Sequence, residues 1–294
     1  MLQREAALRA EARSLVERGE LRAAEALYLQ CEEIGRDLGD AEVRDLAICN
    51  RASVKVSLGC GDELVVALRA ILLATRSETN AFLAAYTVSR HYEYKKEYKK
   101  SLFYGRIALD KVERADNSGL RAGTLNQIGN ALLATSEVNA AQRHYRQALA
   151  LVAEGSVLQG IFLYNLGYCE VLEGRALDGA RKLMRALRIT RRNGARIEEV
   201  QARTDLSFAY LELGRCERAG RHAERALSLA RELDWQHGVK NALYVAGESA
   251  RLAGDLEIAE SRFEELQHDF YPEQPYLGTL LMAVDVRRMI NLHA

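Results

Sequence analysis

The sequence predicts an all-α protein built from a repeated pair of helices, and three observations support this. The chain of 294 residues contains two prolines, Pro272 and Pro275, and both lie near its end. Alanine, leucine, glutamate and arginine are abundant before them, and these residues favour helices whereas proline interrupts them. Small residues also recur at a nearly constant interval, which is typical of a repeat array. Such an array can exceed the usual size of a domain because each unit packs on its neighbours.

The clearest unit is the stretch from Gly129 to Leu149, GNALLATSEVNAAQRHYRQAL. Ala141 follows Gly129 by 12 residues, Tyr145 by 16 and Ala148 by 19. With this spacing, two antiparallel helices approach each other through small residues, and an aromatic side chain fills the space beside them. The rest of the chain repeats the pattern with variations.

Seven units are predicted in order along the chain. They cover approximately residues 5–40, 41–77, 78–117, 118–155, 156–195, 196–235 and 236–270. Their small positions are Ala12, Ala52, Ser89, Gly129, Gly167, Ser207 and Gly247, which from Ser89 onward are 38 to 40 residues apart. Two of the turns, in the third and fourth units, lack the usual glycine.

The second unit is the least regular, and its register stays open. The second helix of this unit has two possible contact sets, either Leu64, Leu68 and Ile71 or Ala67, Ile71 and Ala74. Its small position is Ala52 or Lys55, and alanine suits a close approach of helices better.

A final helix is predicted to close the array. After the seventh unit the stretch HDFYPEQPY (268–276) breaks the helix, and an amphipathic pattern then runs over 277–292. The side chains expected to cover the open end are Leu280, Leu281, Val284, Arg288 and Ile290. A solenoid needs such a cap because its last interface would otherwise be exposed.

Two stretches resemble tetratricopeptide repeat (TPR) proteins. They are LGYCEVLEGRALDGARKLMRAL (166–187) and LSFAYLELGRCERAGRHAERAL (206–227), and the resemblance covers nearly the whole chain. The interval of about 40 residues is similar to that of the subgroup including kinesin light chains, LGN and Rap-type arrays. The resemblance implies a right-handed TPR-type α-solenoid over residues 1–294, in agreement with the periodicity. It is specific for fold and poor for function.

The resemblance also implies where a ligand would bind. In TPR proteins the first helix of each pair lines the concave face, and fixed positions of that helix point into it. Here those positions include Tyr86, Arg90, Asn126, Gln127, Asn130, Tyr164, Asn165, Tyr168, Gln201, Asp205, Phe208, Asn241 and Tyr244.

This set favours a groove for a peptide or protein segment. Asparagine is a poor residue inside helices, yet four asparagines fall on the same predicted face. An amide can both donate to and accept from a peptide main chain, and tyrosine adds apolar area with a polar tip. Among the predicted groove positions, Arg90 is the best candidate to bind a carboxylate of the ligand. The alternative is a solvated groove or internal packing.

The expected function is therefore a non-catalytic scaffold for protein–protein interaction, an adaptor or a regulatory sensor. The sequence has no GxxxxGK[ST], GxGxxG or HExxH pattern, and its histidines are not spaced as metal ligands. No catalytic residue, metal or cofactor is expected. The five scattered cysteines are typical of buried thiols in a reducing cytosol, and no apolar run suits a membrane span, so a cytoplasmic location is expected.

Two alternatives stay open. A basic run, comprising Arg181, Lys182, Arg185, Arg188, Arg191, Arg192 and Arg196, could let a regulatory subunit control a protease or a transcription or sigma factor through its convex or end surfaces. The stretch RHYEYKKEYKKSLFYGR (90–106) could bind single-stranded nucleic acid. The formal net charge of zero disfavours nucleic acid as the main partner. The oligomeric state and the identity of the partner are left open by the sequence.

Overall fold

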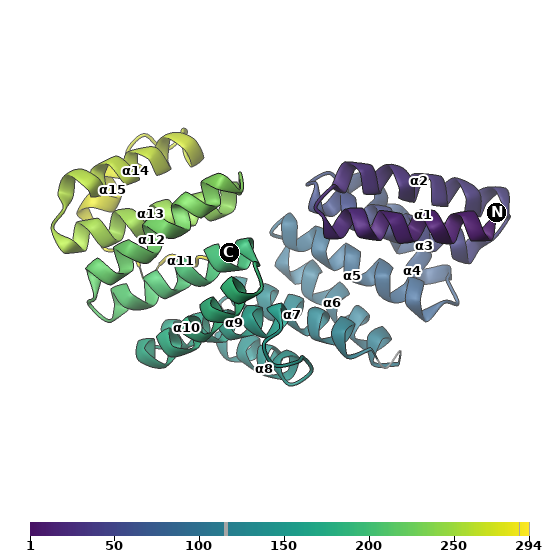
Figure 1. The fold of residues 1–294 in the computed structure, drawn as a ribbon, viewed down its shortest axis with the longest axis horizontal. Coiled ribbons are helices and arrows are strands. Elements are labelled where there is room, and N and C mark those ends of the chain that lie inside the picture. The colour runs from purple at the N-terminus through teal and green to yellow at the C-terminus, as the bar shows by residue number, and fades with distance from the viewer. Residues whose placement is uncertain (115–116, 288, 294) are drawn as a thin grey trace. The chain divides into compact units, whose positions relative to one another are not determined.

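A computed structural model describes residues 1–114, 117–287 and 289–293, and within them it contains fifteen α-helices and one short 3₁₀ helix. The chain divides into two compact units, Met1–Thr135 and Ser136–Ala294. Figure 1 shows successive helices running back and forth within each unit. The all-α repeat fold predicted from the sequence is confirmed.

Unit 1 holds the first seven helices. They are α1 (Leu2–Glu17), α2 (Leu21–Asp37), α3 (Ala41–Ser57), α4 (Val65–Ala74), α5 (Glu78–Tyr94), α6 (Tyr98–Arg114) and α7 (Ser118–Ala134), with the 3₁₀ helix Asp62–Leu64 before α4. Each packs on its neighbour in sequence, and α5 also contacts α3 and α7.

Unit 2 holds the remaining eight helices. They are α8 (Val138–Leu149), α9 (Val157–Leu172), α10 (Ala176–Arg192), α11 (Arg196–Glu212), α12 (Cys216–Glu232), α13 (Gln236–Ala253), α14 (Leu256–Phe270) and α15 (Leu277–Ala283). Besides its neighbours in sequence, α11 contacts α9 and α13. The first helices of three successive pairs, α9, α11 and α13, therefore form one layer. Their partners α10, α12 and α14 form the other layer.

The turns explain why helices can pair without glycine. Gly174, between α9 and α10, has a φ of 80°, a backbone conformation that glycine adopts without strain. The turns expected to lack glycine use Lys96, with a φ of 58°, and Ser136, with a φ of 65°. The backbone of these residues adopts the left-handed conformation at a modest energetic cost, and after Lys96 helix α6 packs back on α5.

The structure settles the register of the second unit. Leu64, Leu68 and Ile71 are buried, whereas Ala74 is exposed. Ala52 is fully buried at the small position, and Lys55 instead forms ion pairs with Glu25 and Glu63.

The last helix is shorter than predicted. The expected helix over 277–292 ends at Ala283, because Val284 adopts an extended conformation with φ of −126° and ψ of 133°. Leu281 is buried as expected, but Leu280 and Val284 are exposed, and Arg288 lies outside the described residues. The described residues after Val284 are irregular, and Leu292 and His293 contact α9 and α11. No helix in the described part of the chain is both long and apolar enough to cross a bilayer.

Candidate functional site

The layer formed by α9, α11 and α13 carries an unusual set of buried polar side chains. Tyr168 on α9, Asp205 on α11 and Asn241 on α13 have exposed fractions of 0%, 0% and 6%. All three were predicted to face the groove. In the structure, residues of the irregular stretch 284–287 and 289–293 lie against them, and we call this stretch the return segment.

The main chain of the return segment is held at Leu292. Its amide nitrogen donates to the hydroxyl oxygen of Tyr168 at 2.8 Å, and its carbonyl oxygen accepts from Nδ2 of Asn241 at 2.8 Å. The Leu292 side chain is itself 2% exposed. Asn241 therefore bonds a backbone carbonyl through its side-chain amide. Here the backbone belongs to the same chain.

The next residue, His293, inserts its ring among polar and aromatic groups. The imidazole stacks on Tyr168, with the ring centroids 4.2 Å apart and the planes inclined by 10°. Its Nε2 lies 3.0 Å from Oδ1 of Asp205, which also accepts from Nε2 of Gln201 at 3.0 Å. Tyr164 approaches the same ring edge-on, with centroids 6.5 Å apart. Four of the predicted site residues thus surround one histidine.

Arg287 anchors the return segment at the other end. Its guanidinium lies 3.3 Å from Oε1 of Glu212 and 3.4 Å from Oε1 of the buried Glu248, and it also donates to the backbone oxygen of Leu211. Hydrogen bonds from Arg287 lower the pKa of Asp285 to about 2. These contacts hold the segment across both α11 and α13.

A cavity of about 390 Å³ remains beside this anchor. It is lined by Val171, Leu172, Glu173, Gly174, Phe208, Glu212 and Arg287. The predicted site residue Phe208 therefore borders the space next to the return segment, and its ring also lies 6.0 Å from that of Tyr168.

Burial reinforces the protonated state of three tyrosines in this layer. It raises the pKa of Tyr164, Tyr168 and Tyr244, so their hydroxyls stay protonated and available as donors. The Tyr168 hydroxyl both accepts from Leu292 and reaches Oδ1 of Asn291 at 3.4 Å. The buried hydroxyl of Tyr244 has no hydrogen-bond partner among the described residues.

In unit 1 two of the predicted site residues, Arg90 and Gln127, bond to the neighbouring helices α3 and α5. Arg90 donates to the hydroxyls of Ser53 and Ser57 at 3.2 and 3.1 Å. Gln127 is buried and donates to Ser89 at 2.8 Å, so it packs internally between α7 and α5 instead of facing a groove.

The other predicted positions of this unit are partly buried or interact locally. Tyr86 stacks on Phe82 with centroids 5.6 Å apart. Asn130 hydrogen-bonds Glu93, whose pKa is raised to about 7, chiefly by burial. Asn126 is half-buried on α7, and in unit 2 Asn165 is buried on α9.

Sequence reasoning missed the partners that the return segment contributes: Arg287, Leu292 and His293. Arg287 and Leu292 were assigned to the amphipathic helix predicted over 277–292, His293 was assigned to no element, and none of these positions follows the repeat. The available signal was the polar stretch DVRR (285–288), which suits a solvated or ion-paired segment better than the apolar face of a cap.

The basic run on α10 is largely neutralised. Lys182 pairs with the two oxygens of Glu170 at 2.7 and 2.8 Å, Arg185 with Glu154 at 2.9 Å and Arg181 with Asp178 at 3.0 Å. Pairing leaves less positive charge for an acidic partner than the sequence suggests.

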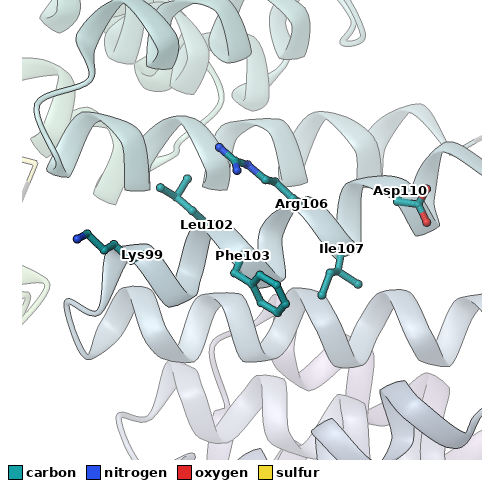
Figure 2. Close-up of a pocket in the computed structure, with 6 residues that line it drawn as sticks. All are labelled: Lys99, Leu102, Phe103, Arg106, Ile107 and Asp110. Atoms are coloured by element: carbon teal, nitrogen blue, oxygen red, sulfur yellow. The ribbon is translucent and has the colours of Figure 1, made fainter.

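Figure 2 shows a second surface, along α6. A hollow of about 680 Å³ is lined by Lys99, Leu102, Phe103, Arg106, Ile107 and Asp110, and Phe103 is 61% exposed. Within the same basic and aromatic stretch, Tyr92 stacks on Tyr104 at 5.7 Å and lies 5.1 Å below the ammonium of Lys100. Tyr92 on α5 and Tyr104 on α6 therefore pack against each other and on a core cluster that includes Val88.

Comparisons with known proteins define the fold. Neither a scan against models of protein families nor a search of curated proteins by sequence finds a match. The structure is nevertheless similar to solved TPR proteins. A Rap protein in complex with Competence and Sporulation Factor has a TM-score of 0.73 at 13% identity, and the match covers 97% of this chain and 79% of that one.

Two further structures agree. A TPR protein from Parabacteroides merdae has a TM-score of 0.60 at 15% identity, over 98% of this chain and 100% of that one. A STAND protein with a TPR sensor from Pyrococcus horikoshii has a TM-score of 0.68 at 17% identity, over 96% of this chain but 43% of that longer one. The chain therefore has the TPR-type fold, and at these identities the similarity concerns the fold alone.

Proposed function

We propose that this chain is a non-catalytic interaction protein that binds a polypeptide segment on the face of α9, α11 and α13. The observation that carries the proposal is the pair of contacts to Leu292. Tyr168 and Asn241 bond the amide and the carbonyl of one residue, and both contacts read the main chain whatever the side chain is. A face that holds a segment of its own chain in this way has the chemistry to hold a segment of another.

The fold supports the same role. TPR-type arrays present their first helices to ligands, and a Rap protein of this fold was solved in complex with Competence and Sporulation Factor. The chain acts as an adaptor or a regulatory sensor in this proposal, with a protein or peptide as partner. The alternative surface, the basic face of α10, receives less support because Arg181, Lys182 and Arg185 are ion-paired within the chain.

Affinity capture from native lysate, followed by mass spectrometry, tests the proposal. Three full-length proteins are compared: the wild type, the groove variant Asn165→Ala with Asn241→Ala, and the surface variant Arg188→Glu with Arg192→Glu. A partner lost in the groove variant and kept in the surface variant supports the proposal. A partner kept in the groove variant and lost in the surface variant contradicts it and favours regulation through α10.

A further inference from the structure

The carboxylate of Asp205 needs a donor from outside its own helix. It is 0% exposed in the middle of α11. Within α11, Gln201 donates one hydrogen bond to Oδ1. Nε2 of His293 lies 3.0 Å from Oδ1 and 3.1 Å from Oδ2, and it donates to the carboxylate when this nitrogen carries the ring proton. The amide nitrogen of Gln201 lies 3.1 Å from the same Nε2. A buried carboxylate is strongly destabilised when its donors are removed, so this position selects for a ligand that carries an N–H group.

The walls of the site restrict the shape of that group. The Tyr168 ring lies parallel to the imidazole at 4.2 Å, and Tyr164 meets it edge-on. Such walls suit a flat ring. A phenylalanine ring would fit between them but has no N–H to offer Asp205. A lysine could donate but has no flat face for Tyr168. An imidazole meets both requirements, because it is planar and the nitrogen facing the carboxylate can carry a proton.

The residue before the histidine is also constrained. Leu292 has its side chain buried and both of its main-chain groups bonded, to Tyr168 and Asn241. An aliphatic residue therefore sets the register that delivers the following ring to Asp205.

We propose that the face of α9, α11 and α13 selects polypeptide segments in which an aliphatic residue directly precedes a histidine. Leu292 and His293 of the same chain occupy this site and compete with such a partner for it. The proposal rests on the proposed function, since it names the class of segment that this face binds. A competitor tethered to the protein has an effective concentration on the order of millimolar. A partner segment therefore binds weakly until the return segment is displaced.

The test measures binding of a fluorescein-labelled synthetic peptide with the sequence of residues 284–294, VDVRRMINLHA. Fluorescence polarisation compares the full-length wild type with a full-length release variant, Leu292→Ser with His293→Ala. The release variant is expected to bind the peptide at least about tenfold more tightly, because the tethered competitor is removed. Equal affinity for both proteins would show that residues 292–293 do not compete for the site.

A second peptide, with alanine in place of the histidine, tests selectivity. It is expected to bind the release variant about tenfold more weakly, since it loses both the stacking and the hydrogen bond to Asp205. Adding Asp205→Asn to the release variant should remove most of this preference. If both peptides bind the release variant equally well, the histidine selection is wrong while the proposed function stands. If neither peptide binds, the proposed function fails as well.

Circular dichroism of the release variant separates loss of folding from loss of binding. Should the double substitution unfold the protein, His293→Ala alone replaces it, with Leu292 left in place. The milder variant is still expected to bind the histidine peptide more tightly than the wild type does. If His293→Ala binds the histidine peptide with the same affinity as the wild type, the return segment does not compete for the site.

Discussion

At the scale of single residues, Glu93 on α5 gives the stability of the protein a pH dependence. Its pKa is raised from 4.5 to about 7, chiefly by burial, against the opposing effects of Asn130 and Arg90. A carboxyl with a higher pKa in the folded state binds its proton more tightly there. The contribution of Glu93 to the free energy of unfolding is therefore fully present below pH 4.5 and is lost as the pH rises through about 7.

Glu93→Gln should remove this loss. At pH 8 the variant is expected to be more stable than the wild type by roughly 2 kcal/mol, and at pH 4.5 the two should be nearly equal. Urea unfolding at a series of pH values measures the difference. Glu33→Gln, at an exposed position of α2, is the control and should leave the pH dependence unchanged. An unchanged slope in Glu93→Gln would contradict the assignment.

Two buried tyrosines on the same face form a matched pair. The Tyr168 hydroxyl accepts from the Leu292 amide, whereas the Tyr244 hydroxyl has no partner among the described residues. Tyr168→Phe should lower the free energy of unfolding by about 1 kcal/mol, since it leaves a buried N–H unpaired. Tyr244→Phe should be neutral or stabilising by up to about 1 kcal/mol, because an unbonded hydroxyl is removed. Equal losses in thermal or urea unfolding would show that the Leu292 contact contributes nothing.

At the scale of elements, the packing of α9 on α10 depends on a close approach between two glycines. A Cβ atom on Gly179 would lie 2.6 Å from the backbone oxygen of Gly167 and 2.6 Å from Cγ2 of Val171. In α12, a Cβ on Gly220 would meet its nearest atom, in Ser249, at an ordinary 3.7 Å. The two positions therefore separate the need for a small residue from the intrinsic cost of glycine in a helix.

Gly179→Ala should destabilise the protein by about 1 to 3 kcal/mol, because the helices must move apart. Gly220→Ala should stabilise it by up to about 1 kcal/mol, since alanine loses less backbone entropy on folding and no contact opposes it. Thermal unfolding of both variants provides the comparison. Similar effects in the two would contradict a close contact between α9 and α10.

Some features of the helices could be predicted from the sequence and others could not. Helix pairs followed from the spacing of small residues, which reflects contacts between neighbours, and even the irregular α4 used one of the two expected contact sets. The concave positions came from the resemblance to TPR proteins, and in unit 2 Tyr168, Asp205 and Asn241 all contact Leu292 or His293. Gln127 does not face a groove, because its amide donates to the buried Ser89 on α5. The return segment could not be predicted, because its partners on α9, α11 and α13 lie 39 to 124 residues away and no repeat spacing connects them.

At the scale of the whole molecule, the return segment adds long-range contacts to a fold otherwise built from neighbours. In a repeat array, each unit is stabilised by its own contacts and by the interfaces beside it. The contacts described for the return segment reach α9, α11 and α13 at once, through Tyr168, Asp205 and Asn241. It should therefore couple the opening of these three helices, and all of these contacts lie in unit 2.

Hydrogen exchange followed by mass spectrometry tests this coupling. In the release variant, Leu292→Ser with His293→Ala, we expect faster exchange in α9, α11 and α13 together. These helices can then open without first breaking the contacts of the return segment. Peptides from α2 and α3 in unit 1 should keep their wild-type rates and serve as the internal control. Faster exchange confined to residues 284–293 would show that the segment rests on the helices without stabilising them. In that case its displacement by a partner could not loosen the array, and a signal would have to come from the released segment itself.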